Sequence, residues 1–153
     1  MVDRVSAWIT LGGSINPAVW ANLKTAIADE GLSTDWGGEP FDEAERIDGQ
    51  ALELCAEEVA YGRFTKLEEL CHRHGVPFVR SCNGYDSQWG AERVVFTGTG
   101  EPVTFPIGND GNPYVDRTKI AELGSLEAVE TYLDAADFAV PPLVVTAEEA
   151  SHD

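Results

Sequence analysis

The chain begins with an alternation of apolar and polar side chains. Over residues 5–11 every second side chain is apolar, which predicts a β-strand with one buried face. Gly12-Gly13-Ser14 ends this pattern. Asn16 and Pro17 then predict the start of a helix, with Asn16 as the N-cap and Pro17 at the first helical position. Apolar residues recur at helical spacing as far as Gly31, a typical glycine helix end. The first unit is therefore a strand followed by a helix.

A second unit repeats this order. Residues 52–57 alternate between apolar and polar and predict another strand. Thr65 and Glu68 have the spacing of a capping box, and the short helix that they open is closed by Gly75. Residues 76–81 then resume as a strand.

These two units favour an α+β fold, a two-layer α/β sandwich with a ferredoxin-like βαββαβ core. The second strand of that core is expected as a short piece at 33–36, within a long polar loop over 33–50. Loops of that length are usually functional or mobile. We expect one α/β domain over residues 1–145 and an unstructured acidic tail over 146–153.

The remainder of the sequence predicts additions to this core. A β-hairpin is expected from 93–97 and 102–107, which flank a glycine-containing turn. Ser125 caps a predicted C-terminal helix, and residues 139–145 read as extended, in the manner of an edge strand. The apolar face of the helix is expected to comprise Leu126, Val129, Leu133 and Ala136.

Charge is the most unusual property of the composition. Hydrophobic residues make up 43% of the 153 positions, which is ordinary for a globular protein, but 27 acids against 10 bases give a net charge of −17. This balance argues against a protein that holds nucleic acid or anionic lipid through its own charge. It favours a protein that presents negative charge to a basic partner.

The acids are concentrated in two blocks, residues 29–58 with a net charge of −10 and residues 101–153 with a net charge of −9. Carboxylates along a ridge can imitate phosphates, which lie about 1.7 Å apart per charge along a duplex axis. We predict partner contacts in both blocks. The predicted contact residues are Asp35, Trp36, Glu39, Asp42, Glu43, Glu45 and Asp48 in the first block and Glu127, Glu130 and Asp134 on the C-terminal helix.

The leading functional hypothesis is a non-catalytic acidic binding or inhibitory protein. It would act on a basic nucleic-acid-binding protein as a nucleic-acid mimic, of the anti-restriction or anti-CRISPR type, as a monomer or dimer, without cofactor or metal. Two alternatives remain open. The acidic faces can simply be solvated. The chain can also be a small enzyme or ligand-binding module, with a pocket near Gly12-Gly13, His72 and His74.

Aromatic residues in loops are candidate interface anchors. Trp36, Tyr85 and Trp89 fall in predicted loops, where they can contact a partner or fold back onto the sheet edge. Trp8 and Trp20 are assigned instead to packing between the first strand and its helix.

The three cysteines do not suggest a disulfide framework, and we expect buried thiols in a cytoplasmic protein. Two chemical alternatives stay open for them. Cys71, His74 and Cys82 resemble metal ligands but lack a defined fourth. Cys71 or Cys82 beside His72 or His74 can also form a nucleophile–base pair. Neither a secretory signal nor an apolar run of membrane-spanning length is expected.

Overall fold

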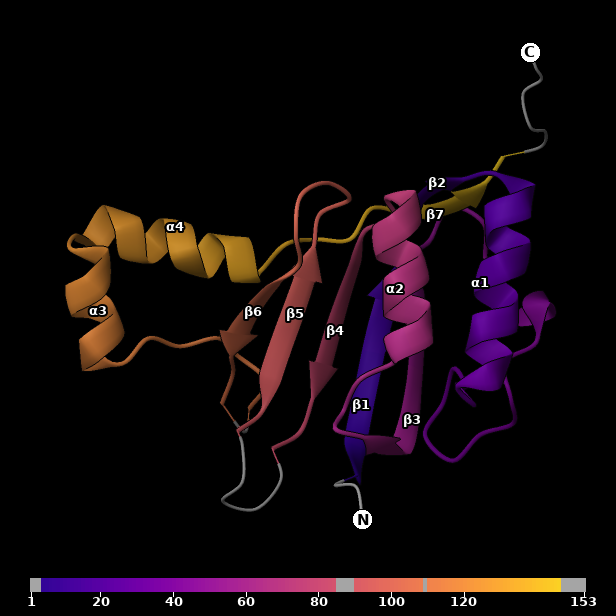
Figure 1. Cartoon of the computed structure of the whole chain (residues 1–153), viewed down its shortest axis with the longest axis horizontal. Coiled ribbons are helices and arrows are strands. Elements are labelled where there is room, and N and C mark those ends of the chain that lie inside the picture. The colour runs from indigo at the N-terminus through magenta and orange to yellow at the C-terminus, as the bar shows by residue number, and fades with distance from the viewer. Residues whose placement is uncertain (1–3, 85–89, 109, 147–153) are drawn as a thin grey trace.

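A five-stranded antiparallel sheet lies at the centre of the computed structural model, which describes residues 4–84, 90–108 and 110–146 (Figure 1). The strands follow one another across the sheet in the order β3-β1-β4-β5-β6. They are β1 (Arg4–Leu11), β3 (Leu52–Ala60), β4 (Phe78–Cys82), β5 (Glu92–Phe96) and β6 (Val103–Pro106).

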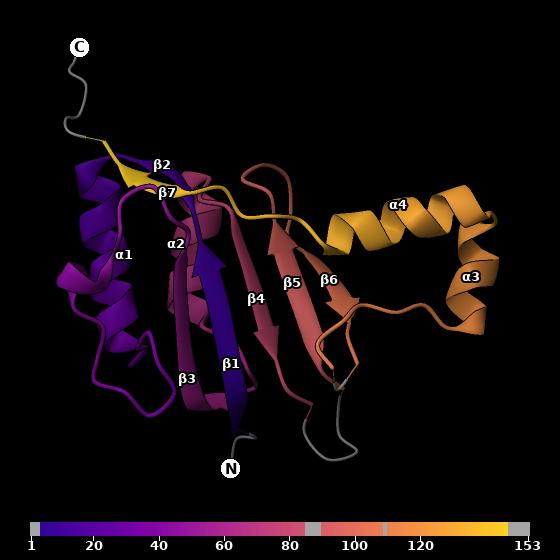
Figure 2. The same cartoon turned by 180° about the vertical axis from the view of Figure 1, so that it is seen from behind.

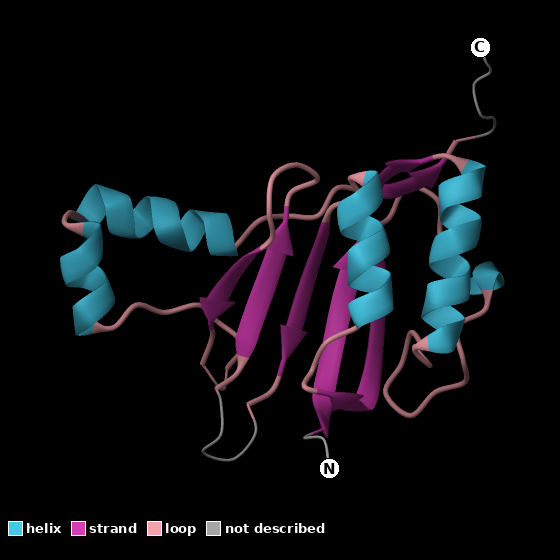
Figure 3. Ribbon diagram, viewed as in Figure 1, coloured by secondary structure: helices cyan, strands magenta, loops and turns pink. Residues whose placement is uncertain are grey.

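Two helices, α1 (Pro17–Asp29) and α2 (Thr65–His74), cover one face of this sheet (Figure 3). Asn16 caps α1 as predicted, because its side chain accepts a 2.8 Å hydrogen bond from the backbone of Val19. Gly75 ends α2 in the left-handed conformation, with φ of 69°. The α+β class predicted from the sequence is confirmed by this arrangement.

The main core fills the space between the helices and the sheet. The apolar positions of β1, namely Ala7, Ile9 and Leu11, are all buried there, which confirms the period-two prediction. They pack with Leu23 of α1, Leu67 of α2 and further residues of both layers. Burial of this apolar surface is the principal force that holds the helices on the sheet.

The strand order differs from the predicted ferredoxin-like core. Residues 33–36 do not form a strand, and Ser33 makes only an isolated antiparallel bridge to Cys55 at the outer edge of β3. The predicted hairpin is also not a separate addition. Its strands β5 and β6 continue the same sheet beyond β4.

A second, two-stranded sheet sits at one end of the molecule, where β2 (Gly13–Ile15) pairs in parallel with β7 (Leu143–Val145). The predicted extended segment 139–145 therefore provides a short strand. Gly12, between β1 and β2, touches this segment so closely that a Cβ atom there would collide with the carbonyl oxygen of Pro141. Thr146 continues the contact by donating a 2.8 Å backbone hydrogen bond to Ile15. The rest of the predicted acidic tail, 147–153, lies outside the described residues.

Two further helices, α3 (Arg117–Leu123) and α4 (Leu126–Ala136), extend from the β6 side of the sheet (Figures 1 and 2). Only α4 was expected, and Ser125 caps it as predicted. The end of α4 packs on the sheet face opposite α1 and α2 through a small apolar cluster of its own. Its buried members are Val95, Phe105 and Ala136.

The predicted apolar face of α4 is only partly correct. Leu126 is 73% exposed, since the first turn of the helix lies beyond the sheet, while Tyr132 packs on Phe105. None of the helices in the described ranges has the length and apolar character needed to cross a bilayer.

A buried arginine joins α2 to the sheet. Arg80 of β4 is 2% exposed, and its guanidinium contacts Glu68 of α2 and Glu92 of β5, each at 3.0 Å. Burial alone lowers the pKa of Arg80, but these two carboxylates outweigh it and raise the pKa, so the arginine stays charged. The start of α2 differs from the predicted capping box between Thr65 and Glu68. Phe64 is the N-cap, and Glu68 accepts its backbone N–H at 2.8 Å.

Candidate functional site

No described helix covers the β1–β3 half of the sheet face opposite α1 and α2 (Figure 2). The alternate positions of β1 that are not in the core, Ser6, Trp8 and Thr10, face this side of the sheet. Trp8 is paired with Cys55 of β3, and the next outward position, Thr10, is paired with Glu53. These four side chains therefore form two adjacent rows on one open surface.

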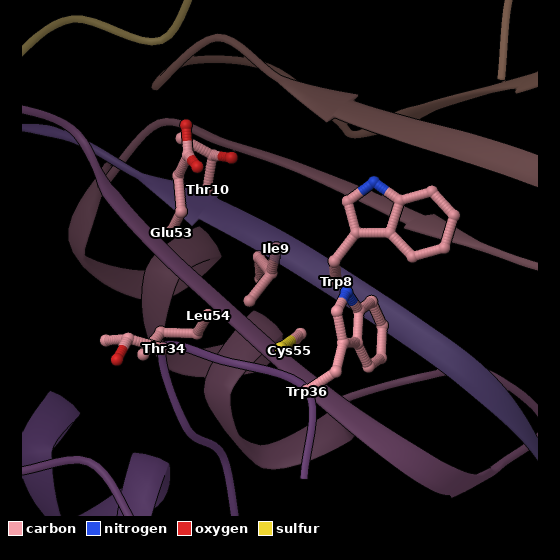
Figure 4. Close-up of a pocket in the computed structure, with 8 residues that line it drawn as sticks. All are labelled: Trp8, Ile9, Thr10, Thr34, Trp36, Glu53, Leu54 and Cys55. Atoms are coloured by element: carbon pink, nitrogen blue, oxygen red, sulfur yellow. The ribbon is translucent and has the colours of Figure 1, made fainter. Parts of the chain in front are cut away.

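Trp36 completes this surface from outside the sheet. Two backbone hydrogen bonds between Ser33 and Cys55, of 3.0 and 2.8 Å, hold the segment after α1 against the edge of β3. Gly37 then turns the chain with φ of 71°. The Trp36 ring returns onto Trp8 with centroids 6.1 Å apart and planes at 77°, the edge-to-face geometry that aromatic pairs prefer (Figure 4).

The two tryptophans and their neighbours line an open hollow of about 580 Å³. Its polar groups are the hydroxyls of Thr10 and Thr34 and the carboxylate of Glu53, and no lysine or arginine lines it. Figure 4 shows Glu53 and Thr10 at one end of the hollow and both indoles at the other. Trp36 remains 51% exposed despite its contact with Trp8. We refer to this surface as the tryptophan hollow.

Carboxylates surround the tryptophan hollow as well as line it. Asp35 and Glu57 are exposed and lie close in the chain to residues that line the hollow, Asp35 between Thr34 and Trp36 and Glu57 two positions along β3 from Cys55. The pKa of Cys55 is raised, first by burial and then by the negative charges of these two carboxylates. Within the described part of the chain, the side chains of Asp35, Glu53 and Glu57 form no ion pair. These three residues, called the acidic rim below, therefore leave their charge unneutralised.

Most of the first predicted contact group has hydrogen-bond partners within the chain. Asp42 caps the short 3-10 helix η1 (Glu43–Glu45) by accepting the N–H of Ala44 at 2.8 Å. Glu45 accepts the backbone N–H of Asp42 and the hydroxyl of Thr34.

Two ion pairs occupy further members of this group. Glu43 accepts hydrogen bonds from Lys24 at 2.7 Å and from the indole of Trp20 at 3.0 Å. Asp48 pairs with Arg46 at 2.8 Å. Sequence reasoning counted these charges but could not show that partners within the chain already engage them.

The predicted contact residues of the 33–50 loop and those on α4 lie at opposite ends of the molecule. The 33–50 loop follows the β3 edge of the sheet, whereas α4 extends from the β6 edge (Figure 1). Glu127, Glu130 and Asp134 are exposed on α4, and Glu39 is exposed in the loop. The two predicted groups do not form one continuous surface.

Trp8 is the principal residue that sequence reasoning missed. It does not pack between strand and helix, since it lies on the face of β1 opposite α1. Its position among Ser6 and Thr10, in the polar phase of the alternation, was the signal that marked it as outward-facing. Trp20 is buried at the helix, as predicted. Tyr85 and Trp89 lie outside the described residues.

The alternative pocket near Gly12-Gly13 is not supported by the local hydrogen bonds. The Gly12 N–H donates to Pro77 and the Gly13 N–H donates to Pro142, so neither amide is free for a phosphate. His72 contacts Gly100 and Phe96.

The cysteines do not form the candidate metal or nucleophile sites. All three are free and buried, and no group of three or more metal-ligating side chains lies together in the described ranges. Burial raises the pKa of Cys71 and also that of Cys82, where Arg80 only partly opposes it. These thiols therefore stay protonated near neutral pH and are poor nucleophiles.

Comparisons with known proteins bring no further candidate. A scan of the sequence against protein-family models finds no match, and searches of curated proteins and of solved structures find no significant similarity.

Proposed function

We propose that this protein is a non-catalytic acidic binding protein whose tryptophan hollow and acidic rim engage a basic protein. The observation that supports this proposal is the exposed Trp36 ring on Trp8, bordered by three unpaired carboxylates. Exposed aromatic side chains are frequent anchors of protein interfaces, and carboxylates around them select a cationic partner.

The partner class follows from the net charge. A charge of −17 attracts basic proteins over long range and speeds their association at low ionic strength. Proteins that bind nucleic acids carry basic surfaces, which a strongly negative protein attracts. The protein would then occupy such a surface and compete with nucleic acid, which is the action of an inhibitor of the anti-restriction or anti-CRISPR type.

Two variants of equal charge can test the proposal. Asp35→Asn, Glu53→Gln and Glu57→Gln together neutralise the acidic rim, and Glu127→Gln, Glu130→Gln and Asp134→Asn neutralise the same number of charges on α4. The parent protein and both variants are immobilised and exposed to bacterial lysate at low salt. Retained proteins are eluted with salt or with duplex DNA and identified by mass spectrometry.

The parent is expected to retain nucleic-acid-binding proteins that salt and DNA release. The rim variant is expected to lose them, while the α4 variant keeps them. Equal retention by all three columns would show that net charge alone accounts for binding, and would overturn the assignment of the site.

The size of the hollow favours one second candidate, a ligand-binding module on a ferredoxin-like scaffold. Its volume of about 580 Å³ lies within the range of small-molecule sites. Strands β3 and β4 are joined through α2 and have β1 between them, which resembles one split βαβ unit, although the overall strand order differs from the ferredoxin-like one. A neutral compound that raises the Tm of the parent but not that of Trp36→Ala would support this alternative.

A further inference from the structure

We infer that the tryptophan hollow binds the guanidinium group of an arginine side chain, an inference that rests on the proposed function and names the group its partner presents. The hollow has the three elements that guanidinium recognition uses, namely indole rings, a carboxylate and neutral hydrogen-bond acceptors. The Trp36 ring is exposed and the Trp8 ring is half-buried. Trp8 and Trp36 supply the indoles, Glu53 supplies the carboxylate with Thr10 beside it, and Thr34 lines the hollow apart from Glu53.

The indoles are arranged for contact with a planar cation. The rings of Trp8 and Trp36 meet edge to face at 77°. They therefore do not cover each other's faces as two stacked rings would. A cation within about 6 Å of an indole centroid is attracted by the ring quadrupole, and Trp is the strongest such acceptor. Trp36 is half exposed, so an incoming side chain can reach it.

Glu53 stands at the distance that an arginine can bridge. It pairs with Thr10, two residues beyond Trp8 on β1, and is therefore a diagonal cross-strand neighbour of the indole. Diagonal neighbours in an antiparallel pair have backbone positions about 7–8 Å apart, so we expect an arginine side chain in the hollow to lie between the indole and the carboxylate. No hydrogen bond or ion pair joins the Glu53 side chain to another described residue, which leaves both its oxygens free.

Arginine fits this geometry better than lysine does. The guanidinium is flat and weakly hydrated, and its donors match the two oxygens of a carboxylate, whereas an ammonium is a compact and strongly hydrated charge. The molecule already places cations over a second tryptophan, since the guanidinium of Arg46 lies 5.3 Å and the ammonium of Lys24 lies 6.0 Å from the centroid of Trp20.

The test follows the indole N–H resonances by NMR while a blocked Gly-Arg-Gly peptide is added. Two further peptides replace arginine by citrulline, its neutral isostere, or by lysine. Single Trp→Phe variants assign the resonances. Trp20 is an internal control, because its indole N–H is already bonded to Glu43. The variants Glu53→Gln and Glu127→Gln remove one exposed carboxylate each, inside and far from the hollow.

The arginine peptide is expected to shift Trp8 and Trp36 saturably and to leave Trp20 unmoved. Citrulline is expected to bind about tenfold more weakly, since both the cation–π contact and the ion pair are lost. Glu53→Gln is expected to weaken arginine binding about fivefold, and Glu127→Gln to leave it unchanged.

Two results would overturn the inference. One is an equal response to arginine and citrulline, or no response at Trp8 and Trp36. The other is equal binding of lysine and arginine, which would remove the guanidinium as the recognised group. If the rim and α4 columns still differ while the indoles stay unmoved, the arginine inference fails and the proposed function stands. If the rim and α4 columns retain the same proteins while the arginine peptide binds, the arginine inference stands and the proposed function fails.

Discussion

The indole nitrogen of Trp20 donates a 3.0 Å hydrogen bond to Glu43, and so connects α1 to the acidic 33–50 loop. Lys24, one helical turn along α1, binds the second oxygen of the same carboxylate at 2.7 Å. Trp20 is 3% exposed, so Glu43 is the partner that satisfies a buried donor. A carboxylate predicted to face a partner also forms a connection within the fold.

Glu43→Ala is expected to lower the free energy of unfolding by about 1–2 kcal/mol, because the buried indole N–H loses its acceptor. Glu43→Gln keeps an acceptor and is expected to cost about 0.5 kcal/mol or less, since the ion pair to Lys24 is half exposed. Urea unfolding followed by circular dichroism measures both. Glu39→Ala, in the same loop, is the matched control, and an equal loss in that variant would contradict the assigned role of Glu43.

The same contacts set a pH dependence. Hydrogen bonds from Lys24 and then Trp20 hold the pKa of Glu43 below its ordinary value of 4.5. The stabilisation is therefore complete above pH 4.5 and is lost as the pH falls through the lowered pKa. The Trp20 indole proton reports this titration by NMR. Its midpoint is expected below 4.5 and should rise in Lys24→Met. A midpoint at or above 4.5 in the parent would show that these bonds do not form.

The buried guanidinium of Arg80 gives a third prediction. Arg80→Met leaves Glu68 and Glu92 facing each other without a cation, and we expect a loss of about 3 kcal/mol in the free energy of unfolding. Glu69→Gln is the control, since Glu69 is exposed on the same helix. Equal urea midpoints for Arg80→Met and the parent would mean that the ion pairs contribute nothing.

Gly12 is expected to tolerate no side chain. In Gly12→Ala the new Cβ would collide with the Pro141 carbonyl, so the segment leading into β7 must move, at a cost of about 2–3 kcal/mol. Gly90→Ala is the matched control because open space surrounds that Cβ position. Thermal unfolding and hydrogen exchange of β2 amides measure the effect. Protected β2 amides in Gly12→Ala would contradict it.

Much of the fold could be predicted where local physics decides it. The alternation over 5–11 identified β1, and the Asn16 and Ser125 caps placed the starts of two helices. Gly75 marked the end of α2. These signals are short in range, because a cap or a left-handed glycine satisfies backbone groups only a few residues away.

The misplaced elements depend on distant contacts instead. Residues 33–36 were expected to form a strand, yet only Ser33 meets a partner, because the chain bends at Thr34 and Asp35 and a turn closed by the Gly38–Asp35 backbone hydrogen bond follows. α3 has seven residues, too few for an apolar stripe to identify it.

The candidate site shows the same limit. Trp36 was singled out because it lies in a polar loop, but Trp8 was assigned to the wrong face of its strand. The hollow that joins them exists only because residues 28 positions apart meet across the edge of β3. Charge counting likewise could not separate the free acids Asp35 and Glu53 from Glu43, whose partners come from α1.

The separate apolar cluster beneath α4 has a consequence for how the molecule can change over evolutionary time. Because Ala136 at the end of the helix packs on Val95 and Phe105 rather than on the main core, substitutions along its outer side leave the principal packing untouched. The charges of this arm can thus drift or be selected independently. One end of the protein is free to diversify while the scaffold beneath the two tryptophans stays constant.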